Sequence, residues 1–159
     1  MKKWVLSRRD SIDMAERIES SLGVKLGLPR STQANCEEPE DGTVFLHFAG
    51  AVFVQSGDQL FPFLGSKEAI SLFPAATVDE GAIKFLLNGA DVMRPGVKDY
   101  DAWGESGRLV IIKERIKERP IAVGKSTVPS DEMASLTKGV CFKNVHRVGD
   151  RFWNLYKTV

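Results

Sequence analysis

The chain has few cysteine and histidine residues, which form disulfides and bind metal ions in small proteins. Its 159 residues include two cysteines, Cys36 and Cys141, and two histidines, His47 and His146. The cysteines stand far apart and form no CxxC pair, so the sequence indicates neither a disulfide framework nor a zinc ribbon. Two isolated thiols are typical of a reducing compartment. We therefore expect no metal ion and no cofactor.

Long apolar runs are also missing. The N-terminus, MKKWVLSRRD, is basic but is followed by no apolar stretch, and no later run is long enough to span a bilayer. The sequence thus predicts neither a signal peptide nor a membrane segment. We expect a cytoplasmic protein.

The chain has no strong excess of either charge. Its 22 basic and 21 acidic residues give a net charge of +1, which excludes a histone-like basic protein. The charge is uneven, however, because residues 1–73 carry 8 basic and 10 acidic residues whereas residues 74–159 carry 14 and 11. The length suits one or two small domains. We place the boundary near Pro74, with an N-terminal domain over 1–74 and a second domain over 75–159.

The first domain is predicted to be a small α/β domain. A strand over 2–7 precedes a helix that ends at Gly23 and has Asp10 or Ser11 as its N-cap. The polar stretch 26–42 contains two prolines and is expected to be a long loop. The other expected elements are strands over 43–48 and 51–55 in an antiparallel meander, and a short helix after Ser66.

The second domain is predicted to be mostly β. Short apolar stretches with turn residues between them are typical of a small barrel. The expected elements are strands over 108–116, 120–128, 140–148 and 151–157 and a short helix over 130–139 that Ser130 caps. The fold class is therefore α+β.

One stretch of the second domain, VDEGAIKFLLNGADVMRPGV (78–97), suggests a binding site. A helix that begins after Asp79 should end at Gly89, because glycine adopts the left-handed conformation easily. Exposed amides at this gap, with Lys84 and Arg94 nearby, would suit a phosphodiester backbone. The alternative is a plain helix-to-strand connector with no binding role.

The same stretch resembles the opening helix and second strand of a PUA domain, with the pattern Gly-Ala-x-x-Phe-x-x-x-Gly-Ala-x-x-Met-x-Pro-Gly. The later segment PIAVGKSTVPSDEMASLTKGVCFKNVHRVGDRFW resembles the rest of that domain in the same order. With a small domain in front, the whole chain is similar to the malignant-T-cell-amplified-sequence family and its archaeal relatives. The resemblance is strong from Thr77 to Tyr156 and weaker before residue 74.

This resemblance implies a pre-PUA domain followed by a PUA pseudobarrel, and RNA binding without catalysis. The expected partners are structured RNA, namely tRNA, rRNA or the small ribosomal subunit, during translation initiation, reinitiation or recycling. For eukaryotic members it also implies a partner protein with an initiation-factor-like domain. The alternative is an accessory or targeting subunit of an enzyme that modifies tRNA or rRNA.

Residue by residue, the resemblance implies an RNA-binding surface at the helix end and the following strand. Lys84 and Arg94 would meet phosphate, Gly89 and Ala90 would permit close approach, and Asn88 could read a base edge. The full set of expected RNA-binding residues is Lys84, Asn88, Gly89, Ala90, Arg94, Pro95, Gly96, Lys143, Arg147 and Arg151.

Two motifs favour an enzyme only superficially. A hydrolase or metal enzyme could use Cys141 and His146, but no supporting motif surrounds them. VGKST (123–127) resembles a phosphate loop but has Arg119 where GxxxxGK[ST] requires its first glycine. We therefore expect no catalytic residues.

Overall fold

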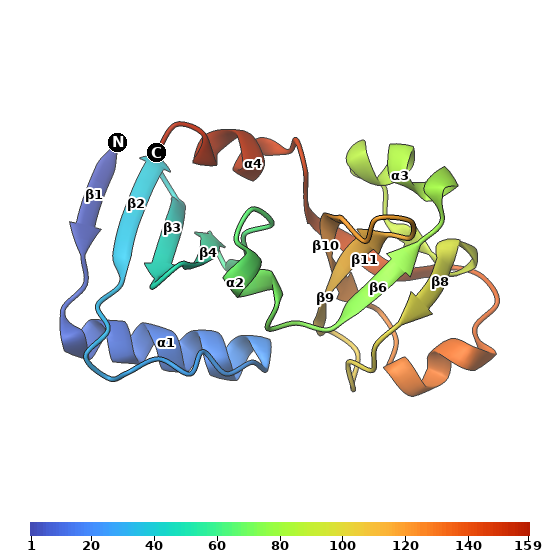
Figure 1. Cartoon of the computed structure of the whole chain (residues 1–159), viewed down its shortest axis with the longest axis horizontal. Coiled ribbons are helices and arrows are strands. Elements are labelled where there is room, and N and C mark those ends of the chain that lie inside the picture. Colours follow the sequence, from blue (N-terminus) through green and yellow to red (C-terminus); the bar gives the residue numbers. More distant parts are fainter. The chain divides into compact units, whose positions relative to one another are not determined.

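The computed structural model describes residues 1–159 and divides them into two compact units (Figure 1). The first unit comprises Met1–Leu72 together with Arg151–Val159, and the second comprises Phe73–Asp150. The expected second domain, 75–159, therefore differs at its C-terminal end, because the last nine residues pack with the first unit. No helix has both the length and the hydropathy that a membrane crossing requires.

The first unit is an antiparallel sheet with helices packed on it (Figure 1). Its five strands lie in sequence order, and the expected meander is present. The strands are β1 (Lys2–Val5), β2 (Asn35–Glu40), β3 (Thr43–Phe48), β4 (Ala51–Ser56) and β5 (Gln59–Pro62), and the helices are α1 (Arg8–Leu22), α2 (Lys67–Ile70) and α4 (Arg151–Tyr156).

The sheet of the first unit carries helices on both faces. Leu46 and Phe48 of β3 are buried on one face, and Phe48 lies beside the α1 residues Ile12 and Ala15. Phe45 points to the other face, since successive side chains of a strand alternate, and its ring centroid lies 5.1 Å from that of Tyr156 in α4. This alternation gives α1 and α4 opposite faces of one sheet.

Three expectations for the first unit and the C-terminus are wrong. The N-cap of α1 is Ser7, whose side chain accepts a hydrogen bond from Asp10 N. Residues 35–40 form β2 instead of a loop, because β1 pairs with one edge of this segment and β3 pairs with the other. Residues 151–156 form α4 instead of a strand. Ser66 does cap α2, as expected, by accepting from Ala69 N.

The second unit is a six-stranded curled sheet. Its strand order is β7-β11-β10-β9-β6-β8, and only β6 and β9 pair in parallel. The elements are β6 (Ala75–Val78), α3 (Glu80–Leu87), β7 (Val92–Met93), the 3-10 turn η1 (Arg94–Gly96), β8 (Val97–Tyr100), β9 (Leu109–Glu114), β10 (Pro120–Ser126), the 3-10 helix η2 (Ser130–Ser135) and β11 (Val140–Arg147).

The core of the second unit fills the inside of this curled sheet. Strands β9, β10 and β11 contribute apolar side chains from within the sheet, and Leu86 contributes from α3. Trp103 packs its ring 5.0 Å from that of Phe142 and donates its indole N–H to Val128 O. Ser130 does not cap the expected helix, since η2 has Pro129 at its N-cap and no side-chain cap bond.

Candidate nucleic-acid interface

The end of α3 is closed by its own backbone. Gly89 has a φ of 93°, the left-handed conformation expected from the sequence. Its N–H donates to Leu86 O at 3.0 Å, and Ala90 N–H donates to Phe85 O at 3.0 Å, which is the bond pair of a Schellman motif. Asn88 N–H is also bonded, to Phe85 O. The expected bare amides at this corner are therefore absent, because these N–H groups already satisfy helix carbonyls.

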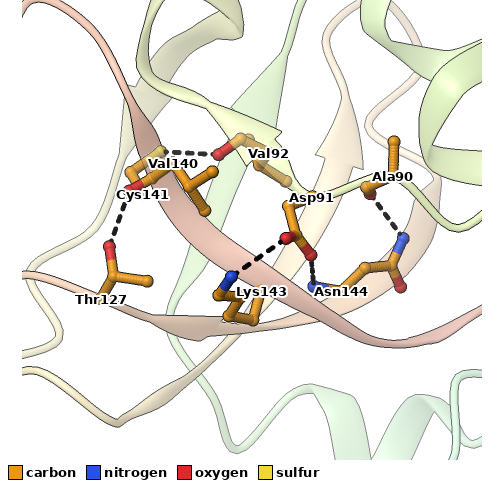
Figure 2. Close-up of polar contacts among 8 residues, drawn as sticks. All are labelled: Ala90, Asp91, Val92, Thr127, Val140, Cys141, Lys143 and Asn144. Carbon is orange, nitrogen blue, oxygen red and sulfur yellow. Dashed lines mark hydrogen bonds and ion pairs between the residues drawn. The ribbon is translucent and has the colours of Figure 1, made fainter.

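Asn144 of β11 fixes this helix end from outside (Figure 2). Its Nδ2 donates to Ala90 O at 2.9 Å and to Leu86 O at 3.1 Å, and its backbone N–H donates to Asp91 Oδ1. One amide side chain thus ties the glycine corner, residues 88–90, to the sheet. Asn144 was not among the expected RNA-binding residues, since no local pattern links it to α3.

Lys143 forms an ion pair with Asp91 beside this corner (Figure 2). Its Nζ lies 3.4 Å from Asp91 Oδ2, and the lysine side chain is exposed. An exposed ion pair of this kind is weak. Lys143 therefore places a positive charge beside the corner, although Asp91 is already its partner in an ion pair.

Arg94 has partners inside the second unit. Its Nε donates to Met133 O at 3.0 Å and its Nη1 donates to Val97 O at 3.2 Å. Its guanidinium also lies 5.8 Å from the ring centre of Tyr100. These contacts join η1, β8 and η2, so Arg94 acts as a clamp between them, and its phosphate contact stays a prediction.

Arg147 is the cation that the structure brings to Gly89. A Cβ added at Gly89 would lie 3.5 Å from Arg147 Nε, an ordinary van der Waals distance, so the guanidinium lies directly against the glycine. Arg147 Nε and Nη1 are enclosed by protein and have no hydrogen-bond partner. Buried donors without a partner are costly, and charged ones especially so. Neither atom is accessible in this structure, so an anion that reached this corner could accept from them only after the Arg147 side chain turned outward.

The other expected residues fall into two groups. Lys84 and Asn88 are exposed on α3 and at its end, and Pro95 and Gly96 lie in η1. Arg151 instead belongs to the first unit, where its guanidinium donates to Glu40 Oε2 and Thr43 Oγ1 at 3.0 to 3.1 Å. Arg151 is therefore not part of the second unit.

An apolar groove flanks the same corner. Its volume is about 440 Å³. Two of its side chains are unusually exposed, Phe85 at 63% and Met93 at 50%. The lining residues are Ala82, Phe85, Leu86, Ala90, Asp91, Val92, Met93, Gly96 and Val140. An exposed aromatic ring is a surface on which single-stranded bases stack. Phe85 could have been noticed in the sequence as an apolar residue outside the buried stripe of α3.

The two residues that an enzyme would use, Cys141 and His146, are both buried in the second unit. Burial raises the pKa of the Cys141 thiol to about 11, and its Sγ donates to Val92 O. A thiol with this pKa is protonated at neutral pH and is not an activated nucleophile. His146 is buried, with its Nδ1 2.9 Å from Asp150 Oδ2. No three His, Cys, Asp or Glu side chains are grouped to hold a metal ion.

Comparison with known proteins identifies the family. A PUA-domain profile matches residues 74–148. Translation machinery-associated protein 20 of Saccharomyces cerevisiae is 33% identical over 135 residues, which cover 80% of this chain and 75% of that protein. An uncharacterized protein of Methanocaldococcus jannaschii is 31% identical over 157 residues, 96% of each chain. This chain belongs to their PUA-domain family.

Other members extend the PUA-domain family to animals and to solved structures. Malignant T-cell-amplified sequence 1 of Danio rerio is 35% identical over 89 residues, 53% of this chain and 48% of that protein. The crystal structure of a hypothetical Pyrococcus horikoshii protein has a TM-score of 0.78 at 26% identity, covering 97% of this chain and 99% of that one. The resemblance read from the sequence is thus confirmed. The matched PUA segment contains α3, the glycine corner, the groove and Arg147.

Proposed function

We propose that this protein is a non-catalytic RNA-binding protein of the translation machinery. Its RNA would be tRNA or the small ribosomal subunit during initiation, reinitiation or recycling. Support comes from two relatives and from the surface around the glycine corner. One relative is named for the translation machinery, and the other is malignant T-cell-amplified sequence 1. A partner protein with an initiation-factor-like domain belongs to the same proposal.

The observation that carries the proposal is that the guanidinium of Arg147 lies beside Gly89 and that its Nε and Nη1 have no hydrogen-bond partner. A phosphate oxygen is the acceptor that best matches a guanidinium, since the pair is charge-assisted and planar. Gly89 adds no side chain of its own, so a ribose-phosphate strand that approached the glycine would meet the guanidinium of Arg147. Lys84, exposed on α3, adds a second positive charge on the helix that ends at this corner.

The groove completes the arrangement. A phosphate at Arg147 would place the adjoining nucleotide near Ala90, which lines the groove. There the base would stack on Phe85 or Met93, and Asn88 is exposed at the helix end to meet its polar edge. This geometry favours an unpaired nucleotide, because a base within a duplex cannot enter a groove. The proposal therefore assigns a single-stranded end or loop of structured RNA to the corner.

The test is direct binding of purified tRNA and of small ribosomal subunits across a salt series. We expect the parent protein to bind with a marked salt dependence, because cations that contact phosphate release counterions. Arg147→Gln combined with Lys84→Gln should weaken binding about tenfold or more and lower the slope of log affinity against log salt by about 1 to 2.

Arg151→Gln is the matched control, since it removes a cation whose partners are Glu40 and Thr43 of the first unit. It should bind RNA as the parent does. Parent-like binding by the double variant would contradict the site. No binding of either RNA by the parent would contradict the function itself.

A further inference from the structure

The turn between β9 and β10 combines exposed cations with an exposed apolar side chain. Residues 113–119 read KERIKER, with four basic and two acidic residues. Arg115, Lys117 and Arg119 are exposed, and Ile116 between them is 69% exposed, more than any other large apolar side chain. We call residues 115–119 the β9–β10 tip. Its cations differ from those of the glycine corner and were not among the expected RNA-binding residues.

The tip is held rigid by an acid that points inward. Glu114 is only 4% exposed. Its Oε1 accepts hydrogen bonds from the backbone N–H groups of Lys117 and Arg119, while Glu114 N–H donates to Arg119 O. The carboxylate is therefore used to shape the turn, and the cations face solvent. A preorganised loop loses little conformational entropy when it binds.

The tip lies at the same end of the second unit as α3 and Arg147. Arg115 Nη2 is 3.7 Å from Glu80 Oε1, at the first residue of α3. Across the β10–β11 ladder, Arg147 pairs with Ala122, two residues beyond Pro120. At about 3.3 Å per strand residue, the base of the tip is roughly 10 Å from Arg147. A folded RNA held at the glycine corner would reach the tip.

We propose that the β9–β10 tip binds the double-helical stem of the RNA whose unpaired nucleotide occupies the glycine corner. The inference rests on the proposed function, because stem and unpaired nucleotide belong to one RNA. Double-stranded RNA is recognised by its phosphates and by the sugar edges of its wide, shallow minor groove. The three exposed cations of the tip meet phosphates, and Ile116 contacts the C–H groups of the riboses that line the minor groove.

A stem fits the tip better than a single strand does. The tip has no aromatic side chain, so it offers no stacking platform for an unpaired base. Its surface is convex and rigid, whereas the aromatic ring Phe85 lies in the groove. The two surfaces therefore divide the RNA, with the unpaired end at the corner and the helical part at the tip.

The experiment compares two synthetic RNA hairpins with the same stem, one blunt and one with a single-stranded 3′ end. The tip variant is Arg115→Gln with Lys117→Gln and Arg119→Gln, which keeps Glu114 and so keeps the turn. The matched control removes three charges elsewhere on the second unit: Arg108→Gln, Lys125→Gln and Lys138→Gln. Thermal unfolding checks that both triple variants keep the parent's melting temperature.

We expect the tip variant to bind both hairpins about tenfold or more weakly than the parent, with a salt slope lower by about 2. The preference for the hairpin with the single-stranded end should be unchanged. Arg147→Gln should do the reverse, removing that preference while leaving the affinity for the blunt hairpin nearly intact. A photocrosslinking residue at Ile116 should react with stem nucleotides.

Three results would overturn the inference. The tip variant could bind both hairpins as the control does, its loss could be confined to the hairpin with the single-stranded end, or the tip cations could be needed for anionic lipid vesicles and not for RNA. Each of these outcomes leaves the proposed function standing. If the parent protein binds neither hairpin, tRNA nor small subunits, the proposed function fails first.

Discussion

Arg94 and Arg147 carry the same charge in the same unit, but their guanidinium groups have different surroundings. Arg94 donates to two backbone carbonyls, whereas Arg147 Nε and Nη1 have no partner. We expect Arg94→Gln to lower the free energy of unfolding by about 1–3 kcal/mol, since it leaves half-buried acceptors unpaired. The salt slope of RNA binding should not change. Urea unfolding and RNA titration check the two effects, and a lower salt slope would return Arg94 to the phosphate contacts.

Asn144 supplies a second prediction at the residue scale. Asn144→Ala removes the donors to Leu86 O and Ala90 O and should destabilise the second unit by about 1–3 kcal/mol. Hydrogen exchange of the amides of Gly89 and Ala90 should accelerate, because the glycine corner loses its anchor to β11. Lys143→Ala is the control, with an expected cost of at most about 1 kcal/mol for an exposed pair. Unchanged exchange in Asn144→Ala would show that the Schellman bonds alone hold the corner.

At the scale of elements, α4 is the clearest case of a segment that serves a unit distant in sequence. Its aromatic side chains pack on the sheet of the first unit, with ring centroids 5.0 Å apart for Phe152 and Phe61 and 4.3 Å apart for Tyr156 and Phe63. We expect removal of residues 151–159 to destabilise the first unit by several kcal/mol, since Phe152, Trp153 and Tyr156 are each partly buried and a fully buried aromatic residue costs about 3–5 kcal/mol when truncated.

The deletion should leave the second unit folded. Two-dimensional NMR of the truncated protein should show native cross-peaks for residues 73–150 and shifted or broadened ones for β3 and β5. Equal loss of cross-peaks in both units would contradict the division of the chain. Thr158→Ala, at the exposed end of the chain, is a control that should leave every element intact.

Local sequence patterns predicted the elements that depend mainly on interactions between residues close in sequence. Periodicity and glycine placed α1, α3 and the left-handed Gly89, and the β-branched runs placed β3, β4, β9, β10 and β11. The acidic strand β2 was missed because its stability comes from pairing with its neighbours, where Lys3 lies 3.7 Å from Glu37. RFWNLYK alternates like a strand, but its apolar residues also fit one face of a helix, and only the sheet of the first unit decides between them.

The site was predictable in its parts and not in its arrangement. Gly89 and Arg147 were both expected to contact RNA, but nothing local in the sequence shows that β11 brings the guanidinium to the glycine. The same holds for Asn144, whose partners lie in α3 and at its end. Bonds of this kind depend on strand register in the whole sheet, and a single sequence does not display it.

At the scale of the whole molecule, each unit contains one buried thiol that should make the fold sensitive to alkali. Burial raises the pKa of Cys36 and of Cys141 from 9.0 to about 11. A raised folded-state pKa means that the stabilisation is complete below pH 9 and is lost as the pH rises through 11, since the unfolded chain ionises first. The expected loss is about 2 kcal/mol for each thiol.

Urea unfolding at pH 7.5 and at pH 10.5 measures this loss. Cys36→Ala with Cys141→Ala should be less stable than the parent at neutral pH, because small cavities form. Its stability should nevertheless fall less between the two pH values. An equal fall in both proteins would show that other groups cause the alkaline sensitivity.

The most direct measurement of the central claim is an NMR titration of ¹⁵N-labelled protein with tRNA. Arg147 Nε–H has no hydrogen-bond partner in the free protein, so its resonance should shift strongly and exchange more slowly once a phosphate accepts from it. The amides of Gly89 and Ala90 should shift in the same titration. If RNA binds while these three resonances stay in place and other surfaces respond, the assignment of the glycine corner is wrong.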